Sequence, residues 1–343
     1  MFAALATPAL LALFTLAAAA ILVGGTRLTG MADRLADRTG LGEALVGGVA
    51  LGAATSLSGS VVSVTAALEG RASLAFANGI GGIAAQTAFL ALADLIHRKA
   101  NLEHAAADLA NVFQGTTLML LLSLPLVAWT LPEVALFGVH PVSIVLAGVY
   151  GLGVYAAGRV RAAPMWRPVH TGATQPDEPA EPAARDASTA ALAARFLALM
   201  LAMGVAGLLL ARTAGVLIDR LELSATLVGA LATAVVTSLP ELVTTLAAVR
   251  RGALQLAVGG IIGGNTFDTL FLTVSDVAYR DGSLYHAVGR ADLFWLVVGL
   301  VLTAILTLGQ LYRQRHGPAG IGLESLVLLG VYAGAVAAQT LLL

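Results

Sequence analysis

Apolar stretches of roughly 20 residues recur along the whole chain, and they restrict the fold more than any other feature. We place them at about 5–25, 44–68, 74–95, 107–129 and 141–158, then at about 192–210, 225–249, 254–274, 291–311 and 322–342. Each is long enough to cross a bilayer core of about 30 Å as a helix. They are continuously apolar and do not alternate, which disfavours membrane-spanning strands. The sequence therefore predicts an all-α integral membrane protein with ten transmembrane helices.

Composition narrows the classes of function. The chain is 58% hydrophobic and 11% charged, against about 25% charged residues in soluble domains. It has no cysteine, which excludes disulfides, thiolate metal sites and a cysteine nucleophile. A net charge of −1 without a basic, aromatic-rich patch indicates no nucleic-acid partner. The first 25 residues lack a basic leader, so we expect a retained first helix and not a cleaved signal peptide.

One segment interrupts the apolar pattern. Residues 163–189 hold five of the eleven prolines and are mostly small or polar, which is typical of a disordered linker. We therefore divide the chain into a first unit of five spans at residues 1–160, a linker at 161–190 and a second unit of five spans at 191–343.

The two units repeat one another at a constant spacing of 182 residues (237 − 55). The matches are Asp37-Arg38 with Asp219-Arg220, Leu45-Val46-Gly47 with Leu227-Val228-Gly229, Thr55-Ser56-Leu57 with Thr237-Ser238-Leu239, Gly70 with Gly252, Gly81-Gly82 with Gly263-Gly264, Phe89-Leu90 with Phe271-Leu272, and Asp94 with Asp276. A general likeness among helices rich in alanine and leucine does not explain the paired polar and glycine residues. The units are therefore internal repeats.

Five spans per repeat is an odd number, so the second repeat enters the membrane from the opposite side. Inverted repeats of this kind are the architecture of many secondary transporters. With both termini outside, fourteen Arg and Lys residues fall on the cytoplasmic side and five on the outer side. This bias predicts a multi-pass protein of the plasma (cell inner) membrane with a cytoplasmic linker.

Two acidic residues stand inside predicted spans. Glu241 is the only charged residue between Leu223 and Val249, and Asp268 lies within the next span. A charge at the bilayer centre costs about 2.5–3.5 kcal/mol. No Lys, Arg or His lies within the central spans. The compensating positive charge must therefore be a bound cation or a proton, unless the acids are simply protonated between helices. Asp94 and Asp276 lie at span ends, where we expect them to be interfacial.

Neutral oxygen ligands accompany Glu241. Thr237 and Ser238 precede it by four and three residues, which places all three on one helix face. Pro240 lacks an N–H and disturbs the turn before it, which frees a carbonyl near Val236. Carboxylates, hydroxyls, amides and free carbonyls form a hard-oxygen ligand set, which suits Ca²⁺ or Na⁺ and not a soft metal.

Further candidates surround Asp268. Asn265 precedes it by three residues, and the run GGIIGGN at 259–265 carries small residues at the spacing that lets two helices approach closely. Gln86 matches Asp268 in the repeat alignment and lines the same cavity or makes a helix–helix hydrogen bond. Thr55 and Ser56, the equivalents of Thr237 and Ser238, complete the candidate metal ligands.

The stretches TSLPELVTTLAAVRRG and LAVGGIIGGNTFDTLF closely resemble the second alpha-repeat of the sodium/calcium exchangers, within the cation/calcium exchanger superfamily. The resemblance covers both halves of the chain. It implies ten spans in two inverted halves, and that Thr237, Ser238, Glu241 and Asp268 coordinate ions that cross by alternating access.

The first repeat departs from that pattern. Where the family has a second Thr-Ser-Leu-Pro-Glu, this chain has Thr55-Ser56-Leu57-Ser58-Gly59, so the glutamate is absent. Two serines that the family associates with sodium are Gly82 and Gly264 here, and a family asparagine is Gln86. If the two motifs face each other, Gly59→Glu, alone or together with Ser58→Pro, is expected to strengthen Ca²⁺ binding.

These observations favour a cation antiporter that exchanges Ca²⁺ for Na⁺ or H⁺, with inorganic cations and the lipid bilayer as its partners and no cofactor. One alternative is a relative that carries only monovalent cations or protons. Another is a non-transporting membrane protein that keeps the fold. An enzyme is not expected, because no aspartyl pair, Ser-Lys dyad or HExxH motif appears. Oligomeric state has no signal in the sequence.

Overall fold

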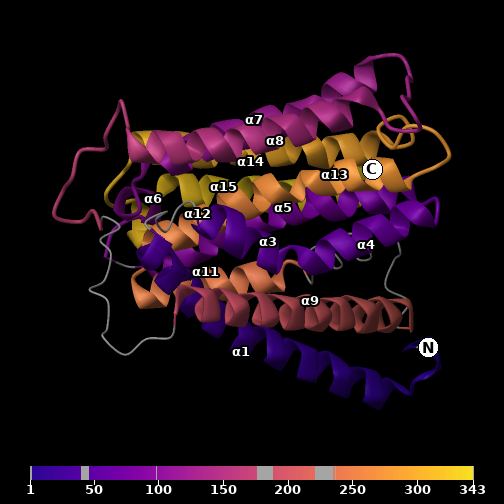
Figure 1. Ribbon diagram of the computed structural model, residues 1–343, viewed down its shortest axis with the longest axis horizontal. Helices are drawn as coiled ribbons and strands as arrows, with labels where there is room; N and C mark the ends of the chain where they lie inside the picture. Colours follow the sequence, from indigo (N-terminus) through magenta and orange to yellow (C-terminus); the bar gives the residue numbers. More distant parts are fainter. Residues whose placement is uncertain are drawn as a thin grey trace.

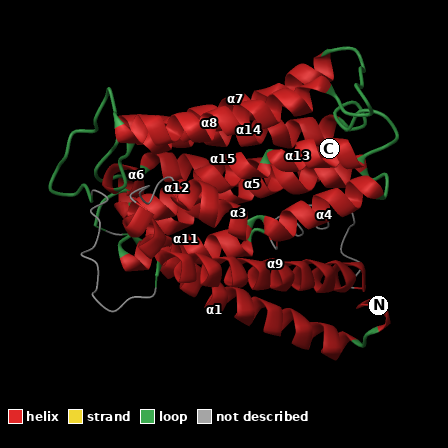
Figure 2. Ribbon diagram, in the orientation of Figure 1, coloured by secondary structure: helices red, strands yellow, loops and turns green. Residues whose placement is uncertain are grey.

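A computed structural model describes residues 2–39, 46–97, 99–175, 188–220, 235 and 237–342. In these residues the regular structure is helical, and the long helices lie along one common axis (Figures 1 and 2). Eight helices of the described part are long and apolar enough to cross a membrane, or nine if one bent pair counts as a single span. The predicted all-helical membrane fold is confirmed.

The first half contains one broken span. Its elements are η1 (Phe2–Ala4), α1 (Thr7–Thr39), η2 (Gly47–Leu51), α3 (Gly52–Thr55), α4 (Leu57–Leu68), α5 (Ala72–Ile96), α6 (Leu102–Ala105), α7 (Leu109–Thr130) and α8 (Pro141–Ala162). The predicted span 44–68 is the broken one: η2, a π-helical turn, leads into α3, and the axis bends by 56° before α4.

The second half follows the same plan. Its elements are α9 (Thr189–Arg220), α11 (Leu239–Arg251), α12 (Leu254–Asp268), α13 (Leu270–Ala278), α14 (Arg290–Tyr312), η3 (Pro318–Gly320) and α15 (Leu323–Leu342). The predicted span 254–274 is built by α12 and α13 together. The predicted span 225–249 lies partly outside the described residues, and its described end forms α11.

The two halves run in opposite directions. The chain enters α1 at the end of the molecule where both termini lie, whereas α9 runs toward that end (Figure 1). Gly70 and Gly252, which the repeat pairs, lie in the turns that follow α4 and α11, with left-handed φ values of 73° and 83°. Such φ values favour glycine. Equivalent helices therefore end in equivalent turns.

Glycines let η2 and α3 cross α12 with their backbones in contact. A Cβ built on Gly263 would lie 1.8 Å from the Cα of Gly48, and one on Gly52 would lie 2.7 Å from the Cα of Gly264. No larger side chain fits at these distances. The close helix approach predicted from the GGIIGGN run is confirmed, and it packs η2 and α3 directly against α12.

Asp94, at the end of α5, fastens two loops at the linker end of the molecule. It is fully buried, and its Oδ1 and Oδ2 accept hydrogen bonds of 2.7 Å from the backbone N–H groups of Leu102 and Gly322. The first bond closes the loop before α6, and the second holds the turn before α15. The carboxylate is at a span end, as expected, but it is not exposed at an interface.

Asp276, at the end of α13, does the same at the opposite end. Its oxygens accept from the backbone N–H groups of Leu284 at 3.1 Å and His140 at 2.7 Å. Leu284 follows Leu102 by 182 residues, and Gly322 follows His140 by the same spacing. The repeat therefore extends beyond the segments compared above, to loops that repeat the same backbone contacts.

The first part of the predicted linker packs against the helical bundle. The backbone N–H of Gln175 donates to the carbonyl of Ala105 at 2.9 Å, and His104 contacts the hydroxyl of Thr171 at 2.8 Å. This part lies against α6. Residues 176–187, on which the prediction of disorder mainly falls, lie outside the described residues.

Candidate cation-binding site

Two helices begin at equivalent serines near the middle of the bundle. The second-repeat break is at Ser238, and α11 begins at Leu239 with Pro240 in its first turn, where a missing N–H costs nothing. The first-repeat break is at Ser56, although Ser58 stands in place of the proline. Proline alone therefore does not cause the break, and the predicted single helix face through 237–241 is instead a helix start. Val236, whose carbonyl was expected to be free, lies outside the described residues.

Glu241 lies in the first turn of α11, where the partial positive charge of the helix N-terminus favours a carboxylate. The residue is 3% exposed. Its Oε1 accepts a hydrogen bond of 3.2 Å from the hydroxyl of Ser56, and the hydroxyl of Thr55 lies beside it. The motifs at 55–59 and 237–241 therefore face each other, as the repeat predicted.

Asp268 ends α12 and is 2% exposed. Its Oδ2 accepts a hydrogen bond of 2.8 Å from Nε2 of Gln86, and the same nitrogen lies 3.3 Å from the hydroxyl of Ser238. Glu241 and Asp268 line one cavity. Gln86 thus makes a contact between helices and also lines the cavity, so both of its predicted roles are present.

A small cavity of about 10 Å³ lies between these groups. Its lining consists of Ser56, Gly59, Asn78, Gly82, Gln86, Thr237, Ser238, Glu241, Asp268 and Phe271. That volume is close to the smallest that holds one water-sized species, about 10–15 Å³. None of the described residues that line it is basic.

Three buried oxygens at this cavity have no hydrogen-bond partner among the described residues. They are Oε2 of Glu241, Oδ1 of Asp268 and Oε1 of Gln86. Buried polar atoms are normally paired, and unpaired ones call for an explanation. All three are acceptors, so they suit a cation or a proton and not an anion.

Six of the eight predicted ligands line the cavity: Ser56, Gln86, Thr237, Ser238, Glu241 and Asp268. Thr55 lies just behind them and donates to the carbonyls of Leu51 and Gly52, at 3.1 and 3.0 Å. Asn265 is directed elsewhere, because its Nδ2 donates to the hydroxyl of Thr87 at 2.9 Å and links α12 to α5. The structure therefore groups all the predicted ligands except Asn265 around one point.

Asn78 is a lining residue that the sequence analysis missed. Its Nδ2 donates to the carbonyl of Gly59 at 3.0 Å and to the hydroxyl of Ser63 at 2.9 Å. Its Oδ1 lies 3.5 Å from the hydroxyl of Thr237. Its equivalent in the second repeat is Gly260, so the repeat alignment gave no signal for this amide. An isolated asparagine in an apolar span was the signal that remained.

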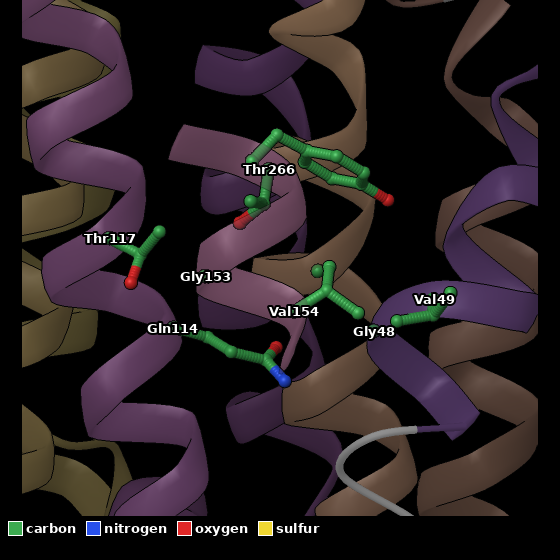
Figure 3. Close-up of a pocket in the computed structure, with 9 residues that line it drawn as sticks. Gly48, Val49, Gln114, Thr117, Gly153, Val154 and Thr266 are labelled. Atoms are coloured by element: carbon green, nitrogen blue, oxygen red, sulfur yellow. The ribbon is translucent and has the colours of Figure 1, made fainter. Parts of the chain in front are cut away.

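A second cavity of about 10 Å³ lies between η2, α7, α8 and α12 (Figure 3). Its lining is Gly48, Val49, Gln114, Thr117, Tyr150, Gly153, Val154, Gly263 and Thr266. No carboxylate reaches it from the described residues, so it lacks the charge that a cation needs. The Glu241–Asp268 cavity remains the candidate site.

Comparison with known proteins agrees with this arrangement. The model of the sodium/calcium exchanger protein family matches residues 9–158 and 191–341, which together are most of the chain. The chain belongs to the sodium/calcium exchanger family. The resemblance noted in the sequence is thereby confirmed, and so is the prediction of a transporter-family protein and not an enzyme.

Individual relatives of this exchanger-family chain are distant. The inner membrane protein YrbG of Escherichia coli (strain K12) is 30% identical over 124 residues, which are 36% of this chain and 37% of YrbG. The chain thus aligns with little more than a third of that relative. The sodium-calcium exchanger NCX_Mj, in crystals soaked with 2.5 mM Na⁺ and 0.1 mM Ca²⁺, matches with a TM-score of 0.71 at 17% identity. That match covers 96% of this chain and 98% of NCX_Mj.

The NCX_Mj structure soaked with neither Na⁺ nor Ca²⁺ matches with a TM-score of 0.67 at 16% identity. At such identities the likeness concerns the fold alone. The shared fold and the family match therefore support cation antiport as the general activity of the family. The ions that this chain carries have to be argued from its own residues.

Proposed function

We propose that this exchanger-family chain is a secondary-active antiporter that exchanges Ca²⁺ for Na⁺ or H⁺ by alternating access. Glu241 and Asp268 bind the transported cation, with Ser56, Gln86, Thr237 and Ser238 as neutral oxygen ligands. The observation that carries the proposal is the group of three unpaired acceptor oxygens on Glu241, Asp268 and Gln86, buried around one cavity without a basic side chain.

Charge supports a cation as the substrate. Two ionised carboxylates in one buried cavity repel each other, and each is costly to remove from water. A divalent cation, two monovalent cations or two protons cancel their charge. Carboxylate, amide and hydroxyl oxygens are the ligands that Ca²⁺ and Na⁺ prefer. The cavity then alternates between charge-matched substrates, which is the requirement of coupled antiport.

The paired helix breaks supply the means of access. Ser56 and Ser238 begin α4 and α11, which extend from the cavity toward opposite ends of the bundle (Figure 1). Broken helices at a repeat interface are where transporters of inverted topology bind their substrates. Small movements of one repeat against the other would expose the same ligands first to one membrane side and then to the other.

A second candidate is exchange of monovalent cations or protons alone. Gly59, Gly82 and the small cavity volume favour it, because they leave the first repeat without a carboxylate and provide fewer oxygens for a large, highly coordinated ion. Protons need no coordination shell at all. The two candidate functions use the same residues and differ only in which ions bind to them.

We further propose that the protein lies in the plasma (cell inner) membrane with both termini outside and the linker in the cytoplasm. The last turns of α8 and α11, at the linker end of the molecule (Figure 1), carry Arg159, Arg161, Arg250 and Arg251, which agrees with the preference of basic residues for the cytoplasmic side. Cysteine substitutions at Gly172 and at the exposed Asp281, labelled from outside intact cells, test this orientation. Only the second is expected to react.

The deciding experiment is ⁴⁵Ca²⁺ uptake into proteoliposomes under an imposed Na⁺ or H⁺ gradient. We expect uptake that depends on one gradient and is lost in Glu241→Gln. Asp292→Asn is the matched control, because Asp292 is a buried acid at the start of α14 that does not line the cavity. Gradient-dependent Na⁺ or H⁺ flux without Ca²⁺ flux would establish the second candidate. Absence of all cation flux from a well-folded protein would leave a non-transporting membrane protein.

A further inference from the structure

Gly59 is the first-repeat equivalent of Glu241, and a phenylalanine from the other repeat occupies the space beside it. A Cβ built on Gly59 would lie 2.7 Å from Cε2 and 3.2 Å from Cζ of Phe271. Real Cβ atoms essentially never lie within 3.0 Å of another heavy atom, so one of the two groups would have to shift. The ring belongs to α13 and is 3% exposed. A side chain at position 59 and this ring are therefore mutually exclusive in the present packing.

A second glycine, Gly79, also packs against the ring of Phe271. A Cβ on Gly79, in α5, would lie 3.4 Å from Cβ and 3.5 Å from Cδ2 of Phe271. The residues equivalent to Gly59 and Gly79 in the second repeat are Glu241 and Ile261. Phe271 itself is matched by Phe89. Both repeats therefore keep the phenylalanine, and only the first repeat has a pair of glycines that receives the phenylalanine of the other.

The same ring separates two spaces. Phe271 lines the cation cavity, and it also lines a cleft of about 360 Å³ between α4 and α13. The other residues of this α4–α13 cleft are Ser60, Val61, Val64, Thr65, Phe267, Leu270 and Val274. Phe267 packs edge-on against Phe271, with ring centroids 6.3 Å apart and planes at 89°. Phe271 is thus the shared wall between a charged cavity and an apolar cleft.

We propose that Phe271 is a specificity-determining residue of the cation site, because its ring, seated on Gly59 and Gly79, excludes a first-repeat carboxylate and limits the cavity to the two acids of the second repeat. This inference rests on the proposed function. It also corrects the expectation that Gly59→Glu strengthens Ca²⁺ binding by itself, because the new side chain collides with Phe271. The first-repeat carboxylate can enter only when the ring is shortened.

Four proteins test this inference: wild type, Gly59→Glu, Phe271→Leu and the double variant. Leucine removes the ring atoms Cε2 and Cζ that face Gly59, and it keeps most of the apolar volume. Phe271→Ala serves as a second shortened variant. Ca²⁺ and Na⁺ binding are measured by calorimetry in detergent together with the melting temperature, and flux is measured in vesicles.

We expect Gly59→Glu alone to lower the melting temperature and to leave Ca²⁺ affinity unchanged or weaker. The double variant is expected to bind Ca²⁺ at least about tenfold more tightly than Phe271→Leu, since Ca²⁺ affinity follows the number of charged ligands. Phe267→Leu is the matched control, because that ring lines the α4–α13 cleft but not the cavity. Combined with Gly59→Glu it should give no gain.

Two results would overturn the inference. One is a Gly59→Glu protein that is as stable as wild type and binds Ca²⁺ more tightly. The other is a double variant, with either leucine or alanine at 271, that binds no more tightly than its single parent. A wild-type protein that binds and carries no cation would refute the proposed function instead, and a gain of binding in the double variant would then still support the role of Phe271.

Discussion

Gln86 and Asp268 occupy the same position in the two repeats and are hydrogen-bonded to each other, Nε2 to Oδ2, at 2.8 Å. The bond joins a neutral amide of one repeat to a carboxylate of the other, which is a charge-assisted pairing. Two acids at this distance would repel, and two amides would leave the pair without charge. Together with the exchange of Glu241 for Gly59, this places both ionisable groups of the cavity in the second repeat.

The first prediction concerns these two acids. Glu241→Gln and Asp268→Asn are each expected to lower cation affinity by about 100-fold or more, because a unit charge at 4 Å is worth about 4 kcal/mol at an effective dielectric of 20. Stability should hold or rise, because each change removes a costly buried charge. Calorimetric titration and thermal unfolding of the purified variants check both parts. Wild-type affinity in a folded Glu241→Gln protein would remove this residue from the site.

The second prediction adds a ligand at Gly82. A Cβ there would lie 3.4 Å from Oγ of Ser238 and 3.7 Å from Oδ2 of Asp268, which are ordinary contact distances. A serine therefore fits and brings a hydroxyl to the carboxylate. We expect Gly82→Ser to bind Na⁺ about fivefold more tightly, the value of one added polar interaction of about 1 kcal/mol.

Gly260→Ser is the control for this gain. Gly260 lies on α12 outside the cavity, and its Cβ would meet only Leu51, at 3.6 Å. Both substitutions exchange a helical glycine for serine, so effects on helix stability cancel. Equal Na⁺ affinities in the two variants would show that position 82 contributes no ligand.

Much of the fold can be predicted from the sequence, because it depends on patterns that extend over many residues. Length and continuous hydrophobicity predict the spans, and the 182-residue spacing predicts the inverted halves. The hydrogen bonds of Asp94 to Gly322 and of Asp276 to His140 are related by the same spacing. The donors are backbone N–H groups, so the donor residues Gly322 and His140 need not be identical. A side-chain alignment does not detect such contacts.

The site was predictable where charge was the signal. Glu241 and Asp268 stand out in an apolar field, and Gln86 follows from the repeat. Phe271 carries no comparable signal, because an aromatic residue in an apolar helix is ordinary until packing places it against Gly59. The break at Ser56 was also hidden, because the chain lacks the proline that marks the equivalent break.

The third prediction concerns Asp94, whose two backbone hydrogen bonds fasten the loops of both repeats. Asp94→Ala leaves two buried N–H groups unpaired, and hydrogen bonds to a charged group are worth about 1.5–3 kcal/mol each. We expect a marked loss of thermal stability with unchanged cation affinity. Asp94→Asn keeps one acceptor oxygen and should lose less. Glu69→Ala is the control, because this acid is exposed and forms a surface ion pair with Arg71. Equal melting temperatures for Asp94→Ala and Glu69→Ala would refute the fastening role.

The fourth prediction is a pH dependence set by Glu103 in α6, at the linker end. Burial, and then the negative charges of Asp94 and Glu324, raise the pKa of Glu103 well above its usual value. The folded state therefore holds a proton that the unfolded state has already released. This stabilisation is complete below the unfolded pKa and is lost as pH rises through the folded pKa.

Melting temperatures between about pH 5 and about pH 9 measure this effect. We expect the wild type to lose stability with rising pH more steeply than Glu103→Gln, which carries the neutral form at every pH. The lowered pKa of His97 also arises from burial, so His97→Asn is compared in parallel to separate its contribution. A slope that is the same with and without Glu103 would assign the dependence to other groups.

The last prediction turns on the charge of the cavity. Glu241 and Asp268 are the only acids among its described lining residues, so the ionised site carries −2. One Ca²⁺, two Na⁺ or two protons neutralise it, whereas a third monovalent ion adds repulsion of about 4 kcal/mol at 4 Å and an effective dielectric of 20. We therefore expect two monovalent ions per Ca²⁺ and no net current. Reversal potentials in proteoliposomes with graded ion gradients measure the ratio, and the Gly59→Glu/Phe271→Leu protein is the matched comparison, with an expected third charge. Ca²⁺ flux in the wild type that drives current at three or more monovalent charges per Ca²⁺ would contradict the argument, because two carboxylates cannot neutralise three positive charges.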